Sequence, residues 1–221
     1  MWIFPLIATV ISALFAAVLM RQYFARRNPA NLVWSVALVI FAVGSACDLA
    51  GSISGWTPFI ARLYYLSGAV IVVGYLAAGT LYLLAPRTIA HIWLVLMLAV
   101  TVTGTILLAT ASVDQAMIDA GDEPGWRAID KPPLLTVLSI SVNSLGTAIL
   151  VGGAVYSAVY RRFPLANILI AAGALIIAGA GTLTRLGQYE FQSIGQAIGI
   201  IVIFAGFLMV SRAGRRPAGR S

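Results

Sequence analysis

Seven long apolar segments run through this chain, and their length limits what it can fold into. A helix needs roughly 20 apolar residues to cross the hydrocarbon layer of a bilayer. Inside that layer the backbone must satisfy its own hydrogen bonds, which favours helices. We therefore predict an all-α membrane protein, one seven-transmembrane-helix bundle covering residues 1–221. The expected helices cover about residues 2–22, 32–51, 58–84, 89–110, 133–157, 166–185 and 192–211.

The composition agrees with a chain that is mostly covered by lipid. Hydrophobic residues make up 61% of the sequence and charged residues only 10%, whereas soluble domains carry about 25% charged residues. The first apolar segment has no basic region before it and is long enough to span. We therefore expect it to be a retained helix rather than a cleaved signal peptide.

The charges divide between the two ends of the expected bundle. Connections on one side hold ten arginines and no acid, whereas those on the other side hold four basic residues and all seven acids. The arginines are Arg21, Arg26, Arg27, Arg87, Arg161, Arg162, Arg212, Arg215, Arg216 and Arg220. Because positive loops stay in the cytoplasm, we predict an N-terminus outside and a C-terminus inside, with a cytoplasmic basic tail over 212–221.

The net charge of +7 follows from this topology and from contact with anionic lipid headgroups. Membrane lipids are thus the expected partners, and a nucleic-acid partner is not needed. The predicted location is the cell membrane, as a multi-pass protein of a bacterial inner or plasma membrane.

The connection 112–132 is the one long loop, and it lies on the acidic, outer side. It carries five of the seven acids together with Trp126 and the pair Pro132-Pro133. One interpretation is a solvated cap with Trp126 at the membrane interface. The other is a lid over the outer mouth of the bundle.

The first three and the last three helices share a spaced set of residues. This pattern predicts parallel repeats joined by the fourth helix, a 3+1+3 plan of a kind found in transporters. Arg26, Ala30, Asn31, Ala42 and Gly51 correspond in spacing to Arg162, Ala166, Asn167, Ala178 and Gly187, and Gly68, Ala78, Gly79 and Leu81 to Gly195, Ala205, Gly206 and Leu208.

The expected bundle has no charged residue near the centre of any helix, although such residues usually mark coupled transport. Lys131 is the only lysine and lies in the outer loop, so a retinal Schiff base has no residue to form on. His91 and Cys47 are the only histidine and cysteine, which argues against haem and zinc sites. We expect no enzyme activity, no catalytic residues, no metal and no cofactor.

Neutral polar residues are the remaining candidates for binding. Ser139, Asn143 and Thr147 recur every four residues and share one face of the fifth helix, with Ser144 beside them. They either bond to a neighbouring helix or form the polar wall of a pocket for a neutral or amphipathic ligand. The candidate ligand-binding residues are Ser139, Asn143, Ser144, Thr147, Gln196 and Tyr65.

A second polar set lies near the outer ends of the helices. Its candidate members are Asp48, Arg62, Arg185 and Glu190. Asp48 could form an ion pair with Arg62 or Arg185. The alternatives are an interfacial anchor belt and an outward-facing vestibule for a charged headgroup or solute.

Small residues are frequent in the last two helices. Gly195 and Gly199 form a close-packing motif, and Gly173 and Gly179 lie on the helix before it. These glycines would join the sixth and seventh helices within one chain or form a homo-oligomer.

The stretch from Leu32-Val33-Trp34-Ser35 to Asp48, with Gly55-Trp56 and the run from Arg62 to Gly68, resembles the seven-helix sensor region of some bacterial histidine kinases. That resemblance implies a sensor. We expect no output domain after Ser211, and we therefore expect such a sensor to signal through a protein partner. The 3+1+3 topology is similar to that of SWEET and PQ-loop transporters, although the Pro-Gln pair is missing.

The leading hypothesis is a non-enzymatic sensor-like or binding module for a neutral or lipid-like ligand. One alternative is a 3+1+3 uniporter-like carrier of small solutes. The other is an accessory or scaffold subunit of a larger membrane complex.

Overall fold

The computed structural model describes residues 2–121, 123–160 and 164–213, without the side chains of 185 and 210–213. Its elements are α1 (Ile3–Arg26), α2 (Pro29–Ser54), α3 (Pro58–Tyr64), the π-helix η1 (Tyr65–Ile71), α4 (Val72–Leu84), α5 (Arg87–Thr110), α6 (Gln115–Ala120), the 3₁₀-helix η2 (Gly125–Ala128), α7 (Pro133–Tyr160), α8 (Pro164–Arg185) and α9 (Glu190–Ala213).

Over these ranges the fold is helical, with no strand and seven helices long and apolar enough to span a membrane. The third span, Pro58–Leu84, is continuous through α3, η1 and α4. The predicted class, an all-α multi-pass membrane protein, is confirmed. Each predicted segment lies on one of these helices. The basic tail beyond 213 and the connection 161–163 lie outside the described residues.

The helices end and begin at residues that favour helix termini. Arg27 closes α1 in a left-handed conformation (φ 53°), and its backbone N–H donates to the Tyr23 carbonyl over 2.7 Å. The next residue, Asn28, accepts a hydrogen bond from the Ala30 N–H, and Pro29 occupies the first turn of α2. A side-chain cap followed by proline favours a helix start.

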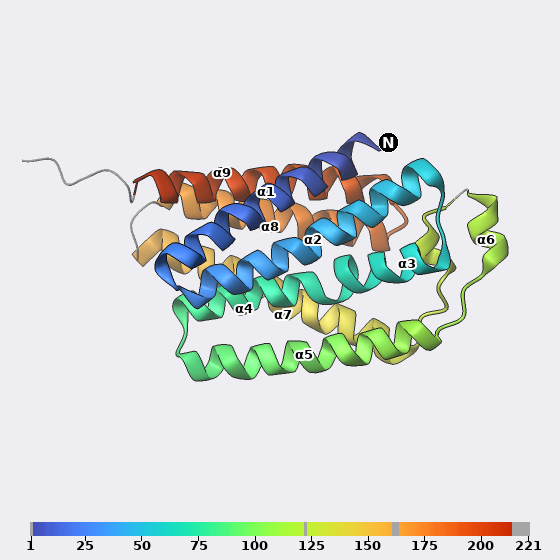
Figure 1. Cartoon of the computed structure of the whole chain (residues 1–221), viewed down its shortest axis with the longest axis horizontal. Helices are drawn as coiled ribbons and strands as arrows, with labels where there is room; N and C mark the ends of the chain where they lie inside the picture. The colour runs from blue at the N-terminus through green and yellow to red at the C-terminus, as the bar shows by residue number, and fades with distance from the viewer. Residues whose placement is uncertain (1, 122, 161–163, 214–221) are drawn as a thin grey trace, which may run out of the picture.

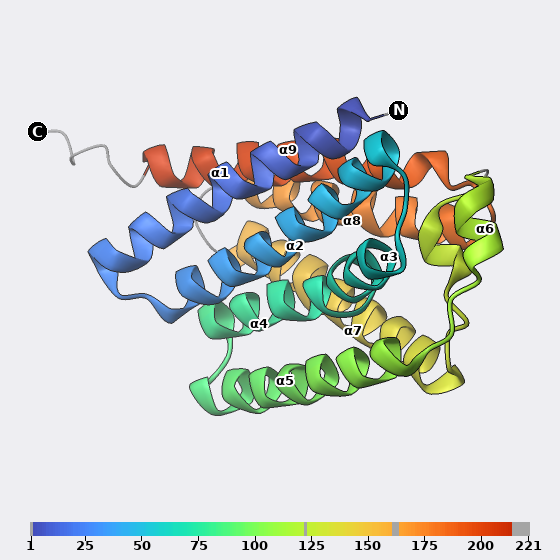
Figure 2. The same ribbon diagram turned by 45° about the vertical axis from the view of Figure 1, so that its right-hand side comes forward.

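The helices run along one long axis, and the N-terminus and the α6 segment lie toward the same end (Figure 1). α1, α2, α8 and α9 form one side of the bundle, whereas α4 and α7 lie between them and α5 (Figure 2). α5 lies at the edge and exposes a long apolar face, with Ile92 and Val95 each 65% exposed. Such a face requires lipid or another protein to cover it.

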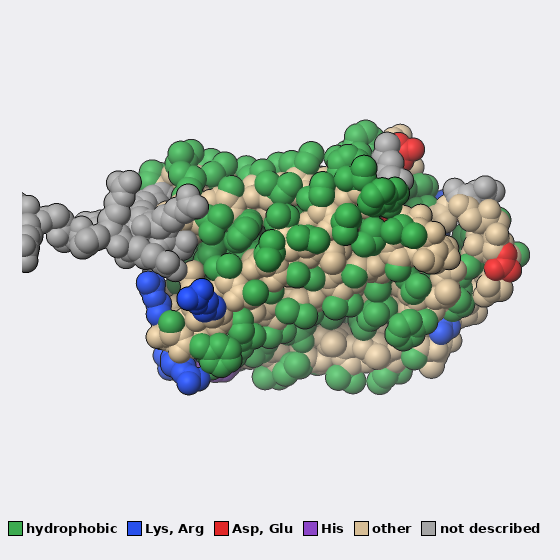
Figure 3. Space-filling view, turned by 45° about the horizontal axis from the view of Figure 1, so that its top comes forward, with side chains coloured by type: hydrophobic (Ala, Val, Ile, Leu, Met, Phe, Trp, Pro, Cys, Tyr) green, Lys and Arg blue, Asp and Glu red, His purple; other side chains and the backbone are tan. Residues whose placement is uncertain are grey.

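Charged side chains gather toward the two ends, and the visible face between them is apolar or neutral (Figure 3). We call the end that carries residues 112–132 the loop end, and the end that carries Arg21, Arg26 and Arg87 the basic end. This division is the one that a bilayer imposes, because a charge in hydrocarbon is costly.

Two apolar clusters form the packed core of the bundle. One joins α5, α7 and the η1–α4 region through buried residues such as Tyr75, Met97 and Leu135. The other joins α1, α2 and α9 through residues such as Phe15 and Phe41. The second cluster also contributes to the wall of a cavity, described below.

The glycines of α8 and α9 bring these two helices together. A Cβ at Gly173 would lie 2.6 Å from the Gly199 carbonyl oxygen, so the backbones meet where no side chain fits. Gly195 packs in the same way against Ala180. Gly179 is exposed, and a Cβ there would meet nothing within 4 Å. Packing within one chain therefore occupies the close-packing motif, while the predicted homo-oligomer is untested.

The segment 112–132 is more ordered than the predicted long loop. It contains α6 and η2, and an isolated bridge joins Val113 to Ile129. Backbone hydrogen bonds from Asp114 N to Ala128 O (2.9 Å) and from Asp130 N to Ser112 O (3.0 Å) close its base. Sequence periodicity could not reveal this, because both helices are only four to six residues long.

Candidate ligand-binding cavity

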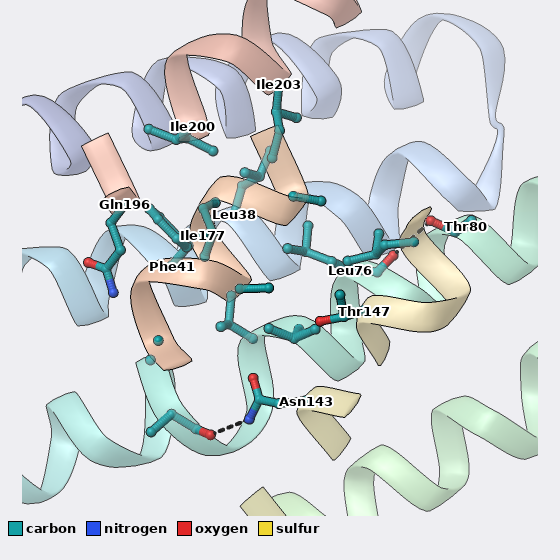
Figure 4. A pocket seen from close by; sticks show the side chains of 18 of the residues that line it. Leu38, Phe41, Leu76, Thr80, Asn143, Thr147, Ile177, Gln196, Ile200 and Ile203 are labelled. Carbon is teal, nitrogen blue, oxygen red and sulfur yellow. Dashed lines mark hydrogen bonds between the residues drawn. The ribbon is translucent and has the colours of Figure 1, made fainter. Parts of the chain in front are cut away.

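A cavity of about 680 Å³ lies inside the bundle, in the size range of small-molecule sites. Its described wall comes from α1, α2, α3, η1, α4, α7, α8 and α9, together with two residues of the 112–132 segment. Most of the wall is hydrocarbon, from residues such as Leu38, Phe41 and Ile177 (Figure 4). We call it the central cavity.

The central cavity is long and narrow. Its wall on α7 runs from Thr136 to Ser157, which corresponds to roughly 32 Å at 1.5 Å per residue. That length is close to the hydrocarbon thickness of a bilayer, about 30 Å. A volume of about 680 Å³ is thus spread along the helices rather than gathered at one level of the bundle. The shape suits one extended hydrocarbon chain better than a compact solute.

The central cavity reaches the outside of the bundle between α7 and α8. Thr136, Ile140 and Ser144 on α7 and Thr182 on α8 line the cavity and are also exposed. All four lie in the half of the bundle nearer the loop end, where α7 runs toward α5 and α8 stays beside α9 (Figures 1 and 2). The opening therefore lies on the side of the bundle, between two helices that are long and apolar enough to span a membrane.

The polar face of α7 forms hydrogen bonds to the π-helix η1, which lies on the opposite wall of the cavity. The Ala69 carbonyl, inside the π-helix η1, accepts hydrogen bonds from Ser139 Oγ (2.7 Å) and Asn143 Nδ2 (2.6 Å). Asn143 Nδ2 also donates to the Ser139 carbonyl over 2.7 Å. Irregular helix geometry in a membrane requires such partners from neighbouring helices. The Asn143 amide oxygen points away from this bond, toward the cavity (Figure 4).

A group of polar side chains closes the loop-end half of the cavity. Gln196 projects from α9 into the same space (Figure 4). Its side chain is 5% exposed, yet its Oε1 has no hydrogen-bond partner. The Tyr64 hydroxyl is approached by the amides of Gln192 and Gln196, and Gln192 Oε1 accepts a hydrogen bond from Thr184 Oγ1 over 2.9 Å. A buried amide oxygen without a donor is costly.

Lys131 is the only charged residue among the described residues that line the cavity. It is half-buried, and its Nζ donates to the Ile129 carbonyl over 3.1 Å. Nζ also lies 5.4 Å from the ring centre of Tyr65 and 5.6 Å from that of Trp126. Burial lowers the pKa of Lys131 from its ordinary value, as does the charge of Arg127, and Asp130 partly opposes this.

The six predicted ligand-binding residues meet in one place. Ser139, Asn143, Ser144, Thr147, Gln196 and Tyr65 all line the central cavity. They come from three segments that are far apart in the sequence, namely η1, α7 and α9. Ser139 and Asn143 thus bond to a neighbouring helix, as the first interpretation predicts, and they also form part of the cavity wall.

Three residues of the predicted outer cluster, Asp48, Arg62 and Glu190, form no ion pair with one another among the described side chains. Asp48 is buried and accepts a 2.6 Å hydrogen bond from Ser193 Oγ, whereas Arg62 Nη2 donates to the Ala111 carbonyl over 2.9 Å. The expected Asp48–Arg62 ion pair is therefore absent, and Arg127–Glu123 is the one ion pair among the described side chains. Glu190 is exposed at the start of α9. The Arg185 side chain lies outside the described part.

Several residues of the cavity wall are not among the six predicted ligand-binding residues. Gln192 lies one helical turn before Gln196, so this spacing could have placed both amides on one face. Lys131 and Trp126 were assigned only to the outer loop. No local pattern reveals that this loop folds back against Tyr65.

No family model, curated protein or solved structure matches this chain. The class of protein therefore rests on its fold and cavity alone. It is an all-helical multi-pass membrane protein with a mainly apolar cavity between its helices.

Proposed function

We propose that this protein is a non-enzymatic, sensor-like binding module that takes a neutral or lipid-like ligand from the bilayer into its central cavity. The observation that carries the proposal is the long, mainly apolar cavity and its opening between α7 and α8 toward lipid. Binding would change the contacts of η1, because α7 holds both the cavity wall and the Ala69 carbonyl. A partner protein would respond to that change in the contacts of η1.

Two glycines offer a matched test of the cavity. Gly68 lines it, and a Cβ there would meet no atom within 4 Å, so a phenylalanine would grow into the empty space. Gly179 is equally open but lies on the exposed surface of α8. The probe is a long-chain alcohol carrying a diazirine, photo-crosslinked to the purified full chain and mapped by mass spectrometry.

In the wild type we expect crosslinks on the cavity-facing residues of α7 and α8. Gly68→Phe should reduce this labelling several-fold, because the ring occupies the ligand's volume, whereas Gly179→Phe should leave it unchanged. Equal labelling of the two variants, or labelling confined to outward-facing residues, would contradict the proposal.

A carrier is the second candidate, because the cavity wall extends to Asn167 and Phe207 near the basic end. A continuous wall between both ends is what a uniporter of the 3+1+3 kind requires. This alternative predicts uptake of solute into proteoliposomes without a proton or sodium gradient. A binding module predicts retention of its ligand and no such flux.

We also propose a parallel repeat of three helices on either side of α5. Two pairs of packing contacts support it, since residues matched by spacing meet equivalent partners in the two halves. In the first pair, the contact of Gly79 with Trp34 corresponds to that of Gly206 with Ile170. In the second pair, the contact of Gly68 with Gly44 corresponds to that of Gly195 with Ala180. Arg162, the counterpart of Arg26, lies outside the described residues. In this arrangement the loop end faces outward and the basic end faces the cytoplasm.

A further inference from the structure

The hydrogen bonds and ion pairs of the described side chains do not explain why Lys131 lies at the cavity wall. An ammonium group has three donors, and the structure assigns one of them, to the Ile129 carbonyl. The only ion pair among the described side chains belongs to other residues. The nearest acid in sequence, Asp130, is exposed and accepts a hydrogen bond from Ser112. Among the described side chains, therefore, no carboxylate forms an ion pair with Lys131, although the charge of Asp130 acts on it.

Aromatic rings fix this cation in place. Tyr65 and Trp126 each lie within 6 Å of Nζ, from two different segments of the chain, a geometry in which ring faces attract a cation. Trp126 is itself packed edge-on against Tyr189, with ring centres 5.9 Å apart. The ammonium is thus positioned beside a nearly uncharged cavity, where the attraction of an anion is screened less than in water.

We propose that the central cavity binds a long-chain carboxylate, with its carboxylate at Lys131 and its hydrocarbon chain between α4, α7 and α8. This inference rests on the proposed function and names the class of ligand. One cation at the wall matches one negative charge, whereas a phosphate would be better served by several cations or a bidentate arginine. The length of the cavity suits a single extended hydrocarbon chain.

The loop-end position of Lys131 agrees with entry from the bilayer. Lys131 lies at the same end of the bundle as Thr136 and Ile140, which border the lateral opening. A fatty acid in the membrane keeps its carboxylate at the interface and its chain in the hydrocarbon. It can therefore pass between α7 and α8 without moving its charge through the apolar core.

The test measures displacement of a fluorescent conjugated-polyene C18 fatty acid from the purified full chain at mildly alkaline pH. The competitors are hexadecanoic acid, 1-hexadecanol and hexadecyl phosphate. The variants are Lys131→Gln, Lys131→Arg and the control Arg87→Gln, which removes a charge from an exposed side chain at the basic end that is not in the cavity wall.

For the wild type and Arg87→Gln we expect hexadecanoic acid to compete about tenfold better than hexadecanol, as a charge-assisted hydrogen bond would provide. Lys131→Gln should bring that ratio close to one without weakening the alcohol, and Lys131→Arg should restore it. Retained alcohol binding shows that the variant is folded.

An unchanged ratio in Lys131→Gln, or equal competition by acid and alcohol in the wild type, would overturn the inference. Stronger competition by hexadecyl phosphate would overturn the carboxylate assignment. These results leave the proposed function intact, because that proposal is tested separately by the crosslinking of the wild type, Gly68→Phe and Gly179→Phe.

Discussion

Asn143 connects the cavity wall to the helix that faces it. It and Ser139 both donate to the Ala69 carbonyl, at the point where the third span is a π-helix. π-helical turns are rare and occur frequently at functional sites. The polar atoms of this face therefore have two tasks, since they stabilise an irregular backbone and leave the Asn143 amide oxygen directed into the cavity (Figure 4).

Asn143→Ala should destabilise the protein by about 1 kcal/mol, a typical value for hydrogen bonds between membrane helices. The loss is limited because Ser139 still donates to the Ala69 carbonyl. The double variant Ser139→Ala/Asn143→Ala should lose more than the sum of the single losses, since it leaves that carbonyl without a side-chain donor. Denaturation in detergent measures the free energy of unfolding of the single variants and of the double variant. Ser141→Ala, on the exposed face, is the control, and strict additivity would contradict this account.

At the scale of the elements, the contact between α8 and α9 depends on glycine more than on any large side chain. Gly173 and Gly199 allow the two backbones to approach within the space of a single methyl group. Close approach of this kind drives helix association in membranes, where lipid removes most of the hydrophobic driving force. The apolar side chains of both helices are then free to face lipid or the cavity.

Gly173→Ala should destabilise the fold by roughly 1–3 kcal/mol, because the added Cβ would lie 2.6 Å from the Gly199 carbonyl oxygen and must displace a helix. Gly179→Ala should have the opposite sign, since alanine favours a helix by about 1 kcal/mol and space is open there. Thermal unfolding of the two variants in the same detergent gives the comparison. Equal and small effects would show that α8 and α9 do not depend on this approach.

The whole molecule is ordered along one axis by charge. The basic end and the loop end are separated by the length of the spanning helices, and the face between them is apolar or neutral (Figure 3). Asp48 is the exception, because it is buried. It is absent from the described cavity wall and bonds to Ser193. The electrostatics therefore continue to favour binding of a lipid-like molecule over ion-coupled transport.

Single-cysteine labelling tests the proposed orientation. The native Cys47 is buried, so a membrane-impermeant maleimide should not react with it. Asp119→Cys, at the loop end, should be labelled in intact cells, whereas Arg21→Cys, at the basic end, should require permeabilisation. Both side chains are exposed in the native fold. The reverse pattern would place the N-terminus in the cytoplasm.

Much of the architecture could be predicted from the sequence, because a bilayer imposes a length and a polarity on every segment that crosses it. The seven helices follow from that constraint, as does the absence of charge from their centres. The six candidate binding residues could be chosen because neutral polar side chains are conspicuous in an apolar helix.

Only the tertiary structure decided which residues meet. The pairing of Asp48 with Ser193, the return of Lys131 to Tyr65 and the divergence of α7 from α8 join segments that are distant in the chain. The bilayer constrains each helix separately, whereas a cavity is the space that several helices leave unfilled when they pack. That space depends on side-chain volumes and crossing geometry, which no single segment encodes.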